Sequence, residues 1–327
     1  MAYKFLLSNF IIQKEKHNMW QKKGLIYSCD FYGTGYAQDA FIDILDDKTW
    51  RIYYSTRTKD VVSLPYFIDV EAGNPRNILK IHDKPLFMPG KIGTFDDNGI
   101  TMTSIVTVND DKYLYYCGWN KRASVPYTLS IGLAIVKNNG TVFEKMFEGP
   151  VMDRSKFNPI AVSAPFVILD EGIFKMWYIS FTSWKVYNGR TEPIFVIKYA
   201  TSNNGIDWST SPKICIDSTY DGESFARPWV IKDKGVYKMW YSPRGPVGYR
   251  EKDGQHYMVD YAESLDGENW ERKPDKFNLT TSESGWDSEM IAYASVIKQN
   301  NIYYMLYNGN NFGKTGFGFA ELISQND

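Results

Sequence analysis

A five-fold internal repeat constrains this chain more than any other feature. Each copy has a small or polar start, an apolar strand, a polar turn and an aromatic-rich strand. The copies recur at intervals of roughly 60 residues and fill almost the whole chain. They read DAFIDILDDKTWRIYYSTR from Asp39, TSIVTVNDDKYLYYCGW from Thr103, APFVILDEGIFKMWYIS from Ala164, RPWVIKDKGVYKMWYSPR from Arg227 and YASVIKQNNIYYMLYNGN from Tyr293.

A second hairpin follows the aromatic strand in each unit. In three units a strand leads into a glycine turn: NNG at Asn138, NNG at Asn203 and LDG at Leu265. Asn-Gly and Asp-Gly supply the positive φ angles of tight hairpin turns. Four strands per unit are typical of a propeller blade, and a β-sandwich would not explain five equal units. The sequence therefore predicts an all-β fold: one domain over residues 1–327, a five-bladed β-propeller with four antiparallel strands per blade.

Composition excludes several classes of protein. The net charge of −1 and the absence of a basic stripe argue against nucleic-acid binding. The aromatic content of 16% suits both strand cores and stacking on sugars. The cysteines and histidines have no metal-type spacing, so neither a metal nor another cofactor is expected. These residues are Cys29, Cys117 and Cys215, and His17, His82 and His256.

The cellular location follows from weaker signals. Three scattered cysteines form no disulfide framework, which is typical of a reducing compartment. No apolar run has transmembrane length. The opening MAYKFLLSNFII has no small-residue cleavage site. We therefore expect a cytoplasmic protein with neither a signal peptide nor a membrane span.

The candidate site follows from propeller geometry, in which the innermost strand of each blade lines a central channel. The loop before each inner strand then points to one shared site. These loops carry carboxylates in four of the five units, an arginine and several aromatic residues. Carboxylate pairs are what cleavage of a glycosidic bond requires. The predicted catalytic residues are Asp97, Glu223 and Glu289, with Asp39 supporting them.

The substrate-binding residues are predicted from the same loops and from the ends of the second strands. Arg227 is expected to bind an anionic group, either a phosphate or a sugar carboxylate. Trp119 and Trp286 are expected to stack on sugar rings. The remaining members of the predicted binding set are Asn98, Asp287 and Asn308.

The repeated G-x-Y-x-M-W-Y and A-x-S-x-D-G-x-x-W patterns resemble the five-bladed propeller glycosidases of families 43 and 32 and the mannoside phosphorylases. The stretches GTFDDNGI, YLYYCGWN, ARPWVI, GWDSEMI and YNGNNFGKTGFG resemble a bacterial group from surface-polysaccharide gene neighbourhoods. The glycosidase resemblance implies an aspartate in the first and third blades and a glutamate in the fourth. Asp39 matches the first, whereas the other two positions fall on Ser163 and Ala226.

The sequence therefore predicts a glycosidase-like carbohydrate-active enzyme. We expect its ligand to be a bacterial surface-glycan precursor or a nucleotide-linked sugar, with hydrolysis and phosphorolysis both open. The alternative is a non-catalytic carbohydrate-binding or accessory module for a glycosyltransferase or sugar-modifying enzyme, and a third reading is a protein-interaction scaffold. Two channel carboxylates about 5–10 Å apart would indicate hydrolysis, and one carboxylate among aromatic residues would indicate binding.

Overall fold

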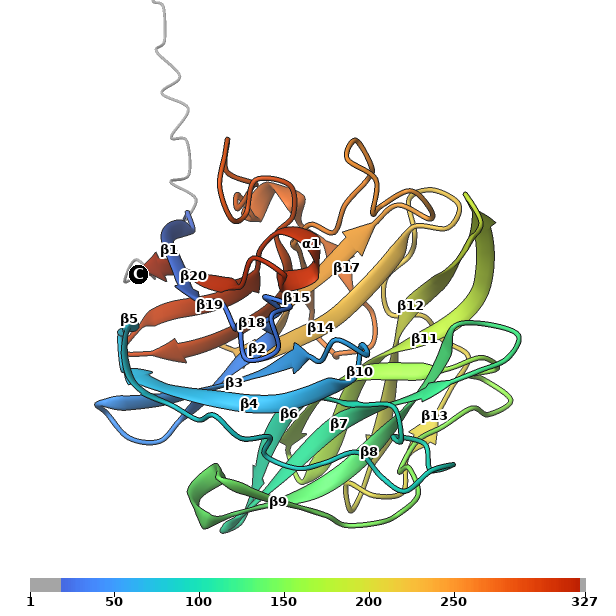
Figure 1. The fold of residues 1–327 in the computed structure, drawn as a ribbon, viewed down its shortest axis with the longest axis horizontal. Coiled ribbons are helices and arrows are strands. Elements are labelled where there is room, and N and C mark those ends of the chain that lie inside the picture. Colours follow the sequence, from blue (N-terminus) through green and yellow to red (C-terminus); the bar gives the residue numbers. More distant parts are fainter. Residues whose placement is uncertain (1–18, 324–327) are drawn as a thin grey trace, which may run out of the picture.

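The chain folds into five radially arranged sheets (Figure 1). The computed structural model describes residues 19–323, so His17 and the opening segment considered for a signal peptide lie outside the described residues. Within that range each sheet has four antiparallel strands, which confirms the predicted five-bladed propeller. No helix in this range is long and apolar enough to cross a bilayer.

The strands run from the channel outward in sequence order in four blades. Blade 1 contains β2 (Gln38–Ile44), β3 (Thr49–Arg57), β4 (Ser63–Glu71) and β5 (Asn74–Ile81), and blade 2 contains β6 (Ile100–Val108), β7 (Asp111–Lys121), β8 (Tyr127–Lys137) and β9 (Val142–Lys145). Blade 3 contains β10 (Val162–Asp170), β11 (Ile173–Tyr187), β12 (Arg190–Ser202) and β13 (Ser209–Thr210), and blade 4 contains β14 (Ser224–Asp233), β15 (Val236–Arg244), β16 (Asp260–Ser264) and β17 (Glu271–Arg272).

Blade 5 joins the two ends of the chain and closes the ring. It contains β18 (Ala292–Gln299), β19 (Ile302–Asn308), β20 (Phe317–Ile323) and, as its outermost strand, β1 (Gln21–Tyr27). The blue β1 lies beside the red β20 in Figure 1. Each inner strand contacts the inner strands of both neighbouring blades, β2 and β18 included. Closure in this way pairs strands from both ends of the described chain within one sheet.

Each glycine turn predicted from the sequence holds two blades together. Tyr53 of blade 1 donates a hydrogen bond to the Gly140 carbonyl of blade 2 (2.9 Å), and Tyr115 donates to Gly205 in the next blade (2.7 Å). Trp177 repeats the contact to Gly267 in blade 4 (2.7 Å). All three glycines have positive φ, between 73° and 81°. The turns therefore need glycine for their backbone conformation and present its carbonyl to the neighbouring blade.

The fourth such contact is missing because blade 5 takes its outer strand from the other end of the chain. The corresponding side chain is Trp240, whose buried indole Nε1 has no hydrogen-bond partner within residues 19–323. Trp240 instead packs edge-on against Trp20, which precedes β1. The repeat is thus broken at the point where the two chain ends meet.

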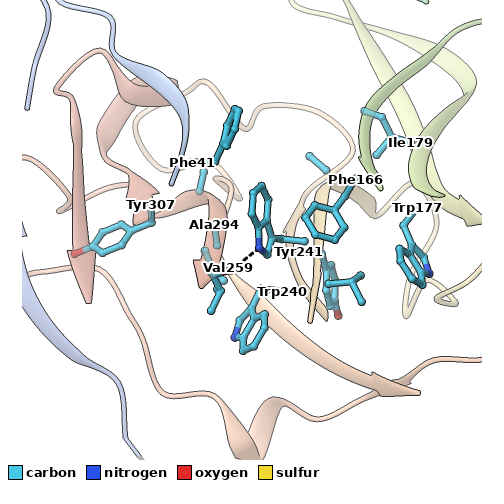
Figure 2. Packing of buried hydrophobic residues seen from close by; sticks show 14 of the residues in the cluster. Phe41, Phe166, Trp177, Ile179, Trp240, Tyr241, Val259, Ala294 and Tyr307 are labelled. Carbon is cyan, nitrogen blue, oxygen red and sulfur yellow. Dashed lines mark hydrogen bonds between the residues drawn. The ribbon is translucent and has the colours of Figure 1, made fainter. Parts of the chain in front are cut away.

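Aromatic residues fill the space between the inner strands. Trp229 of β14 packs against Phe41 of blade 1 and Phe166 of blade 3, with ring centroids 6.0 and 4.5 Å apart. Figure 2 shows Phe41 and Phe166 among the buried aromatic side chains of this cluster. The Trp229 indole donates to the Val296 carbonyl of blade 5 (2.6 Å). Contacts from three other blades therefore meet on this one side chain of blade 4.

Candidate functional site

Each inner strand bulges where it meets the channel, and the register shift falls at the equivalent point in all five blades. The residues at these bulges are those that begin the five sequence copies. We call them the channel ring: Asp39, Thr103, Ala164, Arg227 and Tyr293. Four of the five, all but Thr103, have φ between 45° and 57°. This left-handed conformation is costly for residues other than glycine and concentrates at functional sites.

The channel ring lines a small cavity at the centre of the propeller, which we call the floor cavity. Its volume is about 110 Å³. Arg227 and Asp39 form an ion pair across it, with 2.9 Å between Nη1 and Oδ1. A second Arg227 nitrogen donates to the Asp39 carbonyl at 2.9 Å. The bulges of blades 1 and 4 are therefore joined through a buried charge pair.

Burial governs the electrostatics of this pair. Arg227 is 3% exposed, and its Nε has no partner among the described residues. Desolvation lowers the pKa of the guanidinium, and the charge of Asp39 opposes that effect. Arginine stays protonated even so. Arg227 is therefore a fixed cation that orients Asp39.

Asp39 is the one carboxylate among the described residues that line the channel. Its Oδ1 accepts from Arg227, whereas among the described residues Oδ2 accepts only a 3.3 Å hydrogen bond from the Gln38 amide. Oδ2 therefore keeps capacity for a ligand. A carboxylate at this place can accept a proton, or stabilise positive charge that develops on a sugar ring.

Aromatic side chains form the wall above the floor cavity. Trp119 and Tyr127 pack against each other, with ring centroids 4.9 Å apart and an interplanar angle of 58°. The Trp119 indole is fixed by a hydrogen bond to the Thr101 hydroxyl (2.9 Å). Burial raises the pKa of Tyr127 to about 12, so its hydroxyl stays neutral and can donate. Rings held in this way present flat apolar surfaces and a hydroxyl, which suit sugars.

A wider cavity of about 270 Å³ lies above this wall and shares several of its residues; we call it the mouth cavity. Loops between the second and third strands of the blades, and the ends of those strands, supply most of its lining. Three cations line it, Arg57, Lys121 and Arg250, and no described acidic side chain does. Arg250 is partly neutralised from behind by Glu192, at 3.2 Å. The mouth cavity is therefore electropositive.

The loop between β15 and β16 supplies much of the mouth, and Arg244 supports it. Arg244 is buried and donates from Nε to the Tyr257 hydroxyl at 2.9 Å. Its guanidinium lies 3.8 Å from the centroid of the Tyr249 ring. Tyr249 and Tyr257 both line the mouth cavity. Arg244 is thus a positioning residue behind the wall.

The structure does not bring the three predicted catalytic carboxylates together at the channel. Asp97 accepts from the Gly93 backbone (2.8 Å) and from the Asn120 amide (2.9 Å), so it ties down its own loop. Glu289 is exposed and lines none of the described cavities. It therefore does not join the carboxylates that were expected at the channel.

Glu223 lies at a different place again. It is buried, accepts from the Thr219 backbone at 2.7 Å, and forms an ion pair with Arg272 at 3.0 Å. The open groove that it lines runs beside Lys185 and Asp221 and does not belong to the channel. The contacts of Glu223 hold the loop that leads into β14.

Three predicted binding residues lie within blade 5 and away from the channel. Trp286 stacks on Tyr307, with ring centroids 5.1 Å apart, and Asp287 pairs with Lys22 of β1 at 2.6 Å. Asn308 is fully buried and donates to the Phe312 carbonyl at 3.3 Å. None of the three lines either channel cavity. Their contacts fasten the closing blade, so the expected shared location at the channel is corrected.

The other predicted residues do reach the channel. Asp39 and Arg227 form the floor pair, Trp119 lines both cavities, and Asn98 lines the mouth. The Asn98 amide oxygen accepts from the Lys121 backbone (2.7 Å), which fixes the edge of the mouth. Arg227 thus contacts a carboxylate of the protein, whereas an anionic ligand was expected there.

Sequence reasoning missed the cations of the mouth and the tyrosines of the wall. Most of them come from loops after the second strands, whereas the predicted residues come mainly from the loops before the first strands. Both sets of loops lie at the same end of an antiparallel propeller. The signal was available in Arg57, the last residue of the first sequence copy, and in the long loop that holds Arg250.

The solved structures that this chain resembles include glycoside hydrolases. The chain superimposes on a glycoside hydrolase with a TM-score of 0.70 and 16% identity, covering 96% of this chain and 94% of the other. A thermostable family-43 glycoside hydrolase gives a TM-score of 0.63 and 17% identity over 90% and 91%. A family-32 β-fructofuranosidase from Bombyx mori in complex with sucrose gives 0.57 and 16% over 90% and 62%.

The chain therefore shares the five-bladed propeller fold of these glycoside hydrolases. No established family profile matches the chain. It belongs to the same family as the uncharacterized protein Rv1502 of Mycobacterium tuberculosis strain H37Rv, with 34% identity over 307 residues, 93% of this chain and 99% of the relative. The protein MT1551 of strain CDC 1551 shows the same identity and coverage.

Proposed function

We propose that this protein is a carbohydrate-active enzyme that acts on a small sugar derivative in the central channel, with Asp39 as its working carboxylate. The ligand class is a bacterial surface-glycan precursor or a nucleotide-linked sugar. The observation that carries the proposal is the buried Asp39–Arg227 pair below a wall of aromatic side chains. The glycoside hydrolase fold of the structural neighbours supports it.

The size of the channel favours a small ligand. Pockets for small molecules usually hold about 300–1,000 Å³. The mouth and floor cavities have volumes of about 270 and 110 Å³. This space suits one or two sugar units or a sugar phosphate, bound end-on with its reacting end at Asp39. A polysaccharide segment would need an open cleft across the propeller face.

Each channel group has a role in such a reaction. The ring of Trp119 offers a face on which a sugar stacks, and the Tyr127 hydroxyl can hydrogen-bond a sugar hydroxyl. Asp39 takes a proton from the attacking water or hydroxyl. Arg227 holds the Asp39 carboxylate in one orientation, which counts because misplacement of a base reduces its efficiency steeply.

A second candidate function is carbohydrate binding without turnover, as an accessory module. One specific observation favours it: ordinary glycosidases use two channel carboxylates, and only one lines this channel among the described residues. A binding module would keep the stacking residues and tolerate the loss of Asp39. The two candidates therefore predict different effects of Asp39→Asn: an enzyme loses turnover, whereas a binding module keeps its ligand.

The test is a mass-spectrometric screen of the purified protein against nucleotide-linked sugars, sugar phosphates and surface-glycan oligosaccharides. We expect turnover of a small sugar derivative that Asp39→Asn reduces by about 10²–10⁴-fold, the usual contribution of a general base. Glu289→Gln is the matched control, because Glu289 is exposed and away from the channel. Binding without turnover supports the accessory module. Turnover that survives Asp39→Asn refutes the proposed site.

A further inference from the structure

We propose that the mouth cavity is a phosphate subsite, so that the substrate is an activated sugar whose phosphate or diphosphate sits against Arg57, Lys121 and Arg250. This inference rests on the proposed function, because it places the reacting end of the same ligand at Asp39. The sequence predicted that Arg227 binds the anionic group of the ligand, but Arg227 is paired with Asp39. The cations of the mouth cavity, which have room for a ligand, take that role instead.

Arg57 carries the geometric argument. It lines both the floor and the mouth cavity, so it stands where the two join. Within residues 19–323 no hydrogen bond or ion pair engages its guanidinium, which lies 4.9 Å from the centroid of the Tyr36 ring. A cation–π contact leaves all five N–H donors of arginine free. These donors match the oxygens of a phosphate in a bidentate arrangement.

The charges around Arg57 strengthen the site. The Lys121 ammonium also has no hydrogen-bonding or ionic partner in the part of the chain that the structure describes, and it lines the same cavity. Arg250 keeps one acidic partner, Glu192, behind the cavity wall. Burial raises the pKa of Tyr293, and Arg250 and Arg57 both oppose that rise, so both act on the same channel residue. Three cations around one small cavity indicate a ligand with more than one negative charge.

A phosphate leaving group also accounts for the single channel carboxylate. Departure of a sugar alcohol needs an acid to protonate its oxygen, whereas a phosphate leaves as a stable anion. In the step we propose, Asp39 takes a proton from water or an acceptor hydroxyl, whose oxygen forms the new bond to the anomeric carbon. The bond from that carbon to the phosphate oxygen breaks, and its electron pair stays on the phosphate. The mouth cations stabilise that charge.

The experiment is calorimetric titration with inorganic pyrophosphate and with uridine diphosphate, using uridine as the uncharged comparison. We expect both phosphates to bind and uridine to bind far more weakly. Arg57→Gln should weaken pyrophosphate binding about tenfold or more, as expected for lost charged hydrogen bonds. Arg76→Gln is the matched control, because Arg76 is exposed on the outer strand of blade 1. Unchanged melting temperatures exclude misfolding of either variant.

The possible outcomes separate this inference from the proposed function. Absent pyrophosphate binding, or equal binding by Arg57→Gln and the wild type, overturns the phosphate subsite. Preferential binding of glucuronate over pyrophosphate overturns it in favour of a sugar carboxylate. Turnover of an uncharged glycoside that depends on Asp39 would then leave the proposed function standing. Arg57-dependent pyrophosphate binding without any Asp39-dependent turnover would support the subsite and contradict the proposed reaction.

Discussion

The Asp39–Arg227 pair makes the sharpest stability prediction. The Arg227 side chain is 4% exposed and the Asp39 side chain 14%. Removing one partner of a buried ion pair leaves the other charge uncompensated and costs about 3–5 kcal/mol of unfolding free energy. Arg227→Met should lose this amount. Asp39→Asn should lie at the lower end, about 3 kcal/mol, because an amide oxygen at Oδ1 can still accept from Nη1.

These free energies convert into melting temperatures. At about 2.1 cal/mol/K per residue, a chain of 327 residues has an unfolding entropy of about 0.7 kcal/mol/K. The expected losses therefore lower the melting temperature by about 4–7 °C. Combining both substitutions removes both charges, so the double variant should lose about 0.5–3 kcal/mol less than the two single losses added.

The assay is urea unfolding followed by tryptophan fluorescence, backed by calorimetry at pH 7. Arg76→Gln, on the outer strand β5, is the control and should change stability by less than about 0.5 kcal/mol. Strictly additive losses would show that the two side chains do not interact as described. A loss below about 1 kcal/mol for Arg227→Met would show that the pair is solvated, which contradicts a buried floor.

Three further predictions concern acid stability, thiol reactivity and the wall. Burial by itself would raise the pKa of Asp170 and Asp233, but hydrogen bonds from lysines and tyrosines hold both pKa values below the ordinary value. The two ionised carboxylates therefore stabilise the folded state fully above about pH 3.9, and this contribution is lost as pH falls below that value. The double variant Asp170→Asn/Asp233→Asn should flatten the fall in melting temperature between pH 7 and 3. An unchanged slope would contradict this. Burial raises the pKa of Cys117 to about 11, so a chromogenic disulfide should label it only after unfolding, and rapid labelling of the native protein would refute the burial. Arg244→Gln should raise KM more than it lowers kcat, because it releases Tyr257 without touching Asp39, and an equal fall in kcat would place Arg244 at the reacting atoms.

The repeat pattern predicted the fold and the channel ring because both follow from symmetry. The starting residues of the five copies meet at the axis once five equal sheets close, so Asp39 and Arg227 could be placed from sequence spacing. Their contact with each other could not, because it depends on the left-handed bulges, which have no clear signature outside glycine.

The loop carboxylates were predicted less well, because the direction of a side chain in a loop depends on local hydrogen bonds. The D-D-N-G stretch makes a turn, and Asp97 is used to hold it. Glu223 faces Arg272, which lies 49 residues further along the chain. Arg57 was not among the predicted residues, although it ends the second strand of blade 1 and that end faces the channel.

The most direct test of the account is a crystal structure of Asp39→Asn with the sugar derivative that the wild-type protein consumes. We predict that the anomeric carbon lies within contact of residue 39, with a ring stacked on Trp119 and the anionic group against Arg57. A ligand bound instead in the groove beside Glu223, or outside the channel altogether, would contradict it.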